Sequence, residues 1–135
     1  DIDFFKQVND TYGHLVGDVV LREVAQRVQS TVREMDLVGR YGGEEFGVVL
    51  PDADLALGIQ IADRIRHAVA QHPIEAYDEK VQMTVSIGVT TLFNEKIDAD
   101  QLIDQADQAM YEAKSKGRNL TVSSDRTMTT PKRDA

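Results

Sequence analysis

An alternating run at residues 81–89 constrains the fold of this chain more than any other feature. Its odd positions are apolar and its even positions are small or polar: Val81, Met83, Val85, Ile87 and Val89 against Gln82, Thr84, Ser86 and Gly88. Because successive side chains of a strand point to opposite faces, this pattern predicts a strand with one apolar face. Other elements must cover that face, so we expect a central strand whose sheet has helices packed against it.

Three stretches have the apolar spacing of amphipathic helices and can supply this cover. Apolar residues recur at steps of three and four over 17–35, 53–70 and 99–116, which is the period of one helix face. Asp18 lies near the start of the first stretch, where a carboxylate can cap free N–H groups. Gly117 follows the last stretch and is a suitable end for it.

Gly42 and Gly43 separate two short β-like runs at 37–41 and 45–50. Glycine reaches positive φ at little cost, so the pair predicts a tight two-residue hairpin with Glu44 and Glu45 at its tip. The end of a strand is expected at 1–4 and a short final strand at 120–123. The order strand, helix, hairpin, helix, strand, helix, strand predicts an α/β fold (an α+β sandwich) with a mixed, mainly antiparallel sheet flanked by helices.

Length and composition exclude several classes of protein. The 135 residues suffice for one domain, predicted at 1–123 and followed by a flexible polar tail at 124–135. With no cysteine, thiolate nucleophiles, disulfide frameworks and the usual zinc sites are excluded, so any metal would be held by oxygen. The net charge of -8 opposes binding to polymeric nucleic acid, which depends on many Lys and Arg residues. No apolar run approaches the ~20 residues of a membrane span, so we expect no membrane contact by this domain.

Two pairs of carboxylates are candidates for a metal site. Asp1 and Asp3 share one face if 1–4 is a strand, and Glu44 and Glu45 follow the turn of the hairpin. If the hairpin lies beside the first strand, these like charges repel unless a cation or a proton intervenes. Hard oxygen ligands of this kind suit Mg²⁺, which often shares its shell with phosphate oxygens. The alternative, that they are solvated turn residues, is left open by the spacing alone.

A series of motifs over residues 1–122 resembles the GGDEF family of diguanylate cyclases. The main one is Arg40-Tyr41-Gly42-Gly43-Glu44-Glu45-Phe46, which is similar to the family signature in its GGEEF variant. The others are Asp1-Ile2-Asp3-Phe4-Phe5-Lys6, Asn9-Asp10, Gly13-His14, Gly17-Asp18, Ser86-Ile87-Gly88-Val89, Ala109-Met110-Tyr111-Glu112-Ala113-Lys114 and Gly117-Arg118-Asn119.

The resemblance implies a bacterial signalling enzyme with a fold similar to the nucleotidyl cyclase and polymerase palm. Two GTP molecules would be joined into cyclic di-GMP with release of two pyrophosphates, each ribose 3′-oxygen attacking an α-phosphorus. By the same resemblance, Asp1, the Ile2 carbonyl and Glu44 would bind Mg²⁺, for which Mn²⁺ could substitute. Glu44 would also accept the proton of the 3′-hydroxyl, with Asp3 and Glu45 either behind these ligands or at the surface.

Guanine recognition is implied for Asn9 and Asp18, with His14 in the same nucleotide-binding segment. The guanine edge presents N–H donors that a carboxylate accepts, while an amide can both donate and accept. Two alternatives stay open here: Asp18 as a helix cap, and His14 as a structural residue.

Phosphate binding is implied for Lys6 together with the main-chain N–H groups of Phe4 and Phe5. Lys114 and Arg118, four residues apart across a helix end, would bind the outer phosphates. Their alternative is a solvated last turn, since cations at a helix C-terminus are favoured in any case.

Arg33 and Asp36 form an R-x-x-D sequence with five residues between Asp36 and Gly42. This is the spacing of the inhibitory site that the family uses for its own product, cyclic di-GMP. An arginine fork can bind phosphate or guanine, and a carboxylate can accept the guanine donors. Arg64 would supply an additional arginine.

The reaction brings two nucleotides face to face, so the resemblance implies a homodimer. It also implies that the front of the first strand, an initial helix and an upstream sensory or regulatory domain precede residue 1. The location would be cytoplasmic, or the cytoplasmic part of a larger, perhaps membrane-bound, protein. Two alternatives stay open: a noncatalytic receptor for GTP or cyclic di-GMP, and a chain that is inactive because it lacks the front of the domain.

Overall fold

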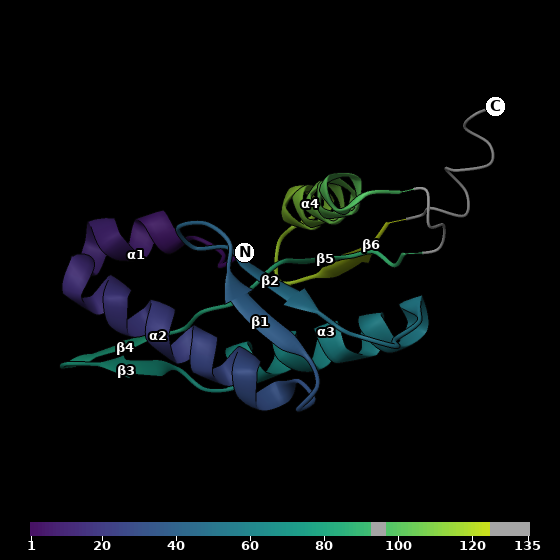
Figure 1. Ribbon diagram of the computed structural model, residues 1–135. Coiled ribbons are helices and arrows are strands. Elements are labelled where there is room, and N and C mark those ends of the chain that lie inside the picture. The colour runs from purple at the N-terminus through teal and green to yellow at the C-terminus, as the bar shows by residue number, and fades with distance from the viewer. Residues whose placement is uncertain (93–96, 125–135) are drawn as a thin grey trace.

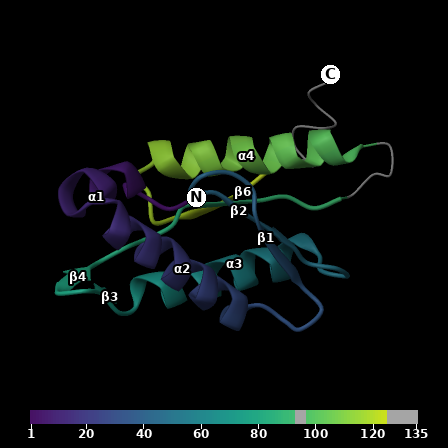
Figure 2. The same ribbon diagram turned by 60° about the vertical axis from the view of Figure 1, so that its left-hand side comes forward.

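Helices lie on both sides of a thin layer of strands in the computed structural model, which describes residues 1–92 and 97–124 (Figure 1). Helix α4 covers one side of strands β5 and β6, and α3 covers the other side with α2 packed beside it (Figure 2). The elements in chain order are α1 (Phe5–Tyr12), α2 (His14–Thr31), β1 (Leu37–Arg40), β2 (Phe46–Val49), α3 (Leu55–Ala70), β3 (Ile74–Ala76), β4 (Glu79–Val81), β5 (Ile87–Val89), α4 (Ala99–Ser115) and β6 (Thr121–Ser123).

The strands form three small pairs. Strands β1 and β2 are antiparallel, with Leu37 opposite Val49, and β3 and β4 form a second antiparallel hairpin that the sequence prediction lacked. Strands β5 and β6 are parallel. The predicted α/β class, with helices flanking a mixed and mainly antiparallel set of strands, is therefore confirmed. The predicted tail at 124–135 lies outside the described residues except for Ser124.

The run at 81–89 is a single long strand in the prediction, and this is wrong. Three different partners divide it: β4 pairs with β3, Val85 forms an isolated antiparallel bridge with Ile2, and β5 pairs with β6. The predicted apolar face is nevertheless present, because Val81, Met83 and Val85 are all buried. The alternation of side chains predicts which face of the segment is buried. Whether the segment forms one continuous strand depends on which distant segments pair with it.

The turn of the first hairpin also differs from the prediction. Arg40 pairs with Phe46, so five residues rather than two form the connection, closed by a hydrogen bond from the Tyr41 N–H to the Glu45 carbonyl (2.7 Å). Neither Gly42 nor Gly43 has positive φ, so the left-handed freedom of glycine is not what this turn uses.

Helix boundaries were predicted well where caps are present. Asp54 caps α3 by accepting from the Leu57 N–H (2.8 Å), and Asp98 forms a capping box with Gln101 at the start of α4. Gly117, with φ +120°, follows the end of α4 as expected.

The first two helices were predicted less well. Helix α1 is absent from the prediction, which expects the end of a strand at 1–4. That strand is wrong: within 1–4 only Ile2 forms an isolated β-bridge, and Phe4, with φ 59°, is the N-cap of α1. Helix α2 begins at His14 rather than at residue 17 and ends at Thr31 rather than at 35. Asp18 therefore lies inside α2, and its interpretation as a helix cap is wrong.

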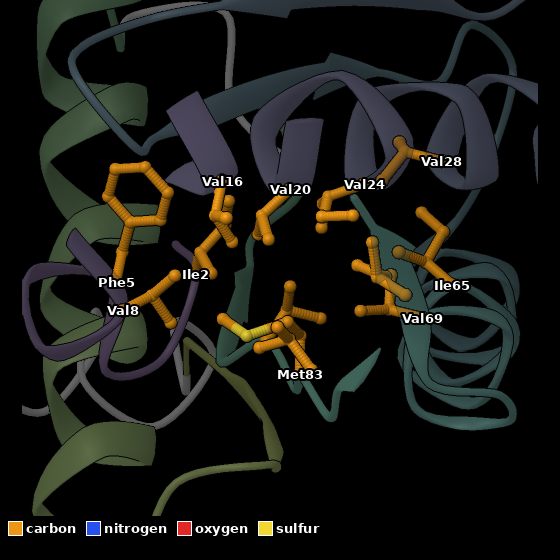
Figure 3. Close-up of a cluster of buried hydrophobic side chains, with 14 of the residues drawn as sticks. Ile2, Phe5, Val8, Val16, Val20, Val24, Val28, Ile65, Val69 and Met83 are labelled. Carbon is orange, nitrogen blue, oxygen red and sulfur yellow. The ribbon is translucent and has the colours of Figure 1, made fainter. Parts of the chain in front are cut away.

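The main core lies between α2, α3 and the strands (Figure 3). Helix α2 contributes one valine stripe, and the edge of the core near the N-terminus is closed by Ile2 and Phe5. Burying each such side chain stabilises the fold by roughly 1.5–3 kcal/mol. The buried members are Ile2, Phe5, Val8, Val16, Val20, Val24, Val28, Ile61, Ile65, Val69, Ile74, Ala76, Val81, Met83 and Val85. Among the described residues, none of the helices is both long and apolar enough to span a membrane.

Candidate active site

The buried carboxylate of Asp3 connects the N-terminal segment to two segments that lie far along the chain. Asp3 is 1% exposed, and four donors reach its side chain. Oδ1 accepts from Ser86 Oγ (2.7 Å) and Lys114 Nζ (3.1 Å), and Oδ2 accepts from Thr84 Oγ1 (2.7 Å) and the Asn119 N–H (3.0 Å). Asp3 thus ties residues 84–86 and the turn after α4 to the start of the chain.

The balance of burial and hydrogen bonding sets the charge state of Asp3. Burial alone would raise the pKa of this carboxyl, but the hydrogen bonds from Ser86, Thr84, Asn119 and Lys114 outweigh it and lower the pKa below 3.8. Asp3 is therefore ionised at neutral pH and provides a fixed negative charge next to Lys114.

Asp1 lies beside Asp3 and shares its cation. Lys114 Nζ is 3.3 Å from Asp1 Oδ1 and 3.1 Å from Asp3 Oδ1, so both carboxylates face the same ammonium. Asp1 Oδ1 is buried and accepts no hydrogen bond from any described residue. The cation expected between like charges is, in this state, the ammonium of Lys114.

The tip of the β1–β2 hairpin approaches Asp1 through the backbone. The Ile2 N–H donates to the Glu44 carbonyl (3.1 Å), and the Ser86 N–H donates to the Asp1 carbonyl (3.0 Å). The first bond joins the hairpin tip to the N-terminal segment, and the second joins residues 84–86 to the same segment.

Asp1 Oδ1 has the properties expected of a ligand for a hard cation. A buried carboxylate oxygen without a hydrogen bond, such as Asp1 Oδ1, is a suitable ligand for a hard cation. Over residues 1–92 and 97–124, no three His, Cys, Asp or Glu side chains cluster closely enough to hold a metal by themselves. A cation here would therefore depend on the two carboxylates, a backbone carbonyl and oxygens from a bound ligand.

A cavity of about 450 Å³ lies between α1, α2 and the hairpin tip. Residues from five of the motifs line it, and six of the nine lining residues were predicted as site residues. The lining consists of Phe5, Lys6, Asn9, His14, Asp18, Leu21, Arg40, Gly43 and Glu44. Its volume and its mixture of cations, carboxylates and an amide suit a small, polar, anionic ligand.

Close helix packing places Asn9 in this cavity. A methyl group on Gly17 would overlap Asn9 Oδ1, so glycine at this position of α2 makes room for the amide. Asp18 follows on the next position of α2 and is exposed, as is His14 at the start of the helix. The amide and the carboxylate predicted for guanine therefore line one cavity.

The predicted phosphate-binding residues divide into two groups. Lys6 lines the cavity and is exposed, with Nζ 3.3 Å from Asp10 Oδ2, and Phe4 and Phe5 begin α1, where helix N–H groups lack intrahelical partners. Lys114 and Arg118 are not among the cavity-lining residues. Lys114 is held by the two aspartates, and the Arg118 guanidinium lies 4.5 Å from the centroid of the Phe4 ring.

The R-x-x-D residues are bound to each other. Asp36 accepts from the Arg33 N–H (2.7 Å) and from Arg33 Nη2 (2.7 Å), while Nη2 also donates to the Pro51 carbonyl (2.8 Å). Hydrogen bonds from Arg33 hold the pKa of the Asp36 carboxyl below its ordinary value of 3.8, and burial opposes them. No hydrogen bond or ion pair among the described residues joins Arg64 to either side chain.

A family model supplies the decisive comparison. The model described as "Diguanylate cyclase, GGDEF domain" matches residues 1–120, which include every residue of the cavity and of the Asp3 network.

The chain belongs to the GGDEF diguanylate cyclase family.

Relatives of known identity and structure agree with this. The response regulator PleD of Caulobacter vibrioides is 48% identical over 124 residues, which are 90% of this chain and 27% of PleD. The crystal structure of the GGDEF domain of DgcB from Caulobacter crescentus, in complex with c-di-GMP, has a TM-score of 0.87 at 31% identity, covering 93% of this chain and 74% of that one. The active GGEEF domain of a Vibrio cholerae diguanylate cyclase has a TM-score of 0.80 at 35% identity, covering 92% and 78%.

Several residues of this GGDEF site were not predicted. Arg40 and Leu21 line the cavity, and Thr84, Ser86 and Asn119 hold Asp3. Arg40 is adjacent to the glycine pair, and its guanidinium donates to the Gly43 carbonyl (2.6 Å). Thr84 and Ser86 occupy even, polar positions of the run at 81–89, and Ser86 also belongs to the motif Ser86-Ile87-Gly88-Val89.

Proposed function

We propose that this chain is a Mg²⁺-dependent cyclase that condenses two GTP molecules into cyclic di-GMP and two pyrophosphates. The observation that carries the proposal is the cavity that unites Lys6, Asn9, Asp18 and Glu44 from four motifs. Asn9 and Asp18 would bind guanine, and Lys6 with the first N–H groups of α1 would bind phosphate. The GGEEF form of the signature is compatible with activity, since the similar Vibrio cholerae domain is described as active.

Each protomer would hold one GTP, so that catalysis takes place between two copies of the chain. A bound divalent cation would neutralise charge on the attacking and leaving oxygens. Asp1, the Ile2 carbonyl and Glu44 would hold that cation. Glu44 would accept the proton of the 3′-hydroxyl, and Lys114 and Arg118 would approach the outer phosphates. An upstream regulatory domain in a cytoplasmic setting would control the pairing, as the chain's 27% share of PleD suggests.

The test is to incubate the chain, and a version extended at its N-terminus, with GTP and Mg²⁺ and to measure cyclic di-GMP. Glu44→Ala should reduce product at least about a hundredfold, as expected when a group acting in the transition state is removed, while the exposed Glu79→Ala should leave it unchanged. Abundant product from Glu44→Ala would contradict the role of Glu44. Product from neither version would favour a noncatalytic receptor for GTP or cyclic di-GMP.

Product inhibition at Arg33, Asp36 and Arg64 is a second part of the proposal. Its support is the position of the R-x-x-D sequence relative to Gly42 and the buried, ionised Asp36. Because Arg33 already donates to Asp36 and Pro51, a ligand would have to replace these bonds. Cyclic di-GMP added to the assay should slow the wild-type chain and should slow Arg33→Ala less; equal inhibition of both would contradict this site.

A further inference from the structure

Lys114 makes two contacts that differ in how firmly they are held. Its ammonium lies 3.1 Å from Asp3 Oδ1 and 3.3 Å from Asp1 Oδ1, and its side chain is 17% exposed. Asp3 is fixed by three further hydrogen bonds, from Thr84, Ser86 and the Asn119 N–H. Asp1 Oδ1 accepts no hydrogen bond from the described residues, so the contact to Asp1 is the one that can be exchanged.

We propose that Asp3 is a positioning residue that holds the Lys114 ammonium beside Asp1, where it serves as an internal counter-cation that a divalent cation must displace. This inference rests on the proposed role of Asp1 as a metal ligand. It assigns to Asp3 a function through Lys114, and it makes the affinity of the site for metal depend on a residue at the far end of the chain.

The physical reason is the cost of leaving paired carboxylates without a cation. Asp1 and Asp3 are both largely buried, with side-chain exposures of 10% and 0%, and a buried charge is tolerated only when it is paired. Lys114 fills this need without metal, and its positive charge then opposes the approach of Mg²⁺ to Asp1. A phosphate arriving with the cation offers Lys114 a new partner, so binding of metal and of nucleotide should be positively coupled.

The test uses Mn²⁺ alone, titrated into the nucleotide-free chain, with free Mn²⁺ measured by electron paramagnetic resonance. Lys114→Gln removes the charge but keeps an amide donor for Asp3. Its matched control is Lys116→Gln, because Lys116 lies two residues on, is 60% exposed and pairs with Glu112. Removing a charge within about 4 Å of the ligand should lower the Kd for Mn²⁺ about fivefold or more in Lys114→Gln and less than about twofold in the control.

Two outcomes would overturn the proposal: equal Kd values for both glutamine variants, or weaker Mn²⁺ binding by Lys114→Gln than by the wild-type chain. A purely structural Lys114 would lower the melting temperature and leave the Kd unchanged. Asp3→Asn provides the second variant, and it also serves if Lys114→Gln does not fold. It should weaken Mn²⁺ binding of the wild-type chain, because Lys114 then pairs with Asp1 alone.

The same Asp3→Asn change should weaken Mn²⁺ binding less when Lys114 is already Gln than in the wild-type chain, since the part of its effect that acts through the lysine is then absent. An equal effect in both backgrounds would contradict the positioning role. These measurements need no turnover. A chain that makes cyclic di-GMP but shows no Lys114 effect refutes this inference alone, and one that shows the effect but makes no product refutes only the proposed activity.

Discussion

Two buried aspartates of this domain are held by opposite means. Asp36 receives its hydrogen bonds from Arg33, three residues before it in the chain. Asp3 receives its hydrogen bonds from Thr84, Ser86, Lys114 and Asn119, which are 81 to 116 residues away. The first arrangement can form as one turn, whereas the second exists only once three distant segments have come together. The hydrogen bonds of Asp3 therefore depend on assembly of the whole site, whereas those of Asp36 depend on one local turn.

Replacing Asp3 by Ala should have the largest effect on stability. It leaves the donors of Ser86, Thr84 and Asn119 without their acceptor and removes one partner of a buried ion pair, which should lower the free energy of unfolding by about 3–5 kcal/mol. Urea denaturation followed by circular dichroism measures this. Thr84→Val, which removes a single hydroxyl, should cost about 1–2 kcal/mol; a loss as small for Asp3→Ala would break the comparison.

Replacing Asp36 by Ala should cost less than half of the free energy lost in Asp3→Ala, since one partly exposed arginine loses its partner and can reach water. Urea denaturation again measures the free energy of unfolding, with the exposed Glu34→Ala as the neighbouring control. An equal or larger loss for Asp36→Ala would show that this turn is as deeply integrated as the Asp3 network.

Acidification should weaken both arrangements. The folded-state pKa values of Asp3 and Asp36 lie below the ordinary value of 3.8, so each carboxylate contributes stability that is fully present above about pH 5. That contribution is lost as the pH falls through the folded-state pKa. Asp3→Asn and Asp36→Asn should therefore each flatten the fall in unfolding free energy between about pH 4 and pH 2, measured by urea denaturation at each pH. An unchanged slope would contradict the pKa direction for that residue.

The exposed ion pair of Lys6 and Asp10 should contribute less to stability than either buried aspartate. Their side chains are 88% and 65% exposed, and such pairs contribute little to folding. Lys6→Ala should change the free energy of unfolding by less than about 0.5 kcal/mol. In the cyclase assay the same variant should raise the KM for GTP, a separation that a structural role for Lys6 would not produce.

Local signals in the sequence were sufficient for part of this fold. Helices α3 and α4 and the strands of the first hairpin were predicted close to their observed bounds, because apolar spacing and caps such as Asp54 and Asp98 act within a few residues. The motifs likewise indicated Lys6, Asn9, Asp18 and Glu44, which line one cavity.

Other features depended on contacts that no local pattern contains. The run at 81–89 became separate short elements because Ile2 and two different strands each pair with part of it. Helix α1 is too short for the spacing of its apolar residues to predict a helix. Within α2, Gly17 lies against Asn9 of α1, a contact between two helices that apolar spacing does not report.

The sequence by itself determined which faces are apolar and where α3 and α4 begin, and its motifs indicated Lys6, Asn9, Asp18 and Glu44, which line one cavity. Only the tertiary structure decided that Lys114 would pair with Asp1 and Asp3 and that Arg118 would lie over Phe4. The physical reason is that the spacing of residues along the chain determines local geometry, whereas the partner of a buried charged side chain depends on which segments fold around it. A carboxylate removed from water requires whichever donors the assembled fold brings to it.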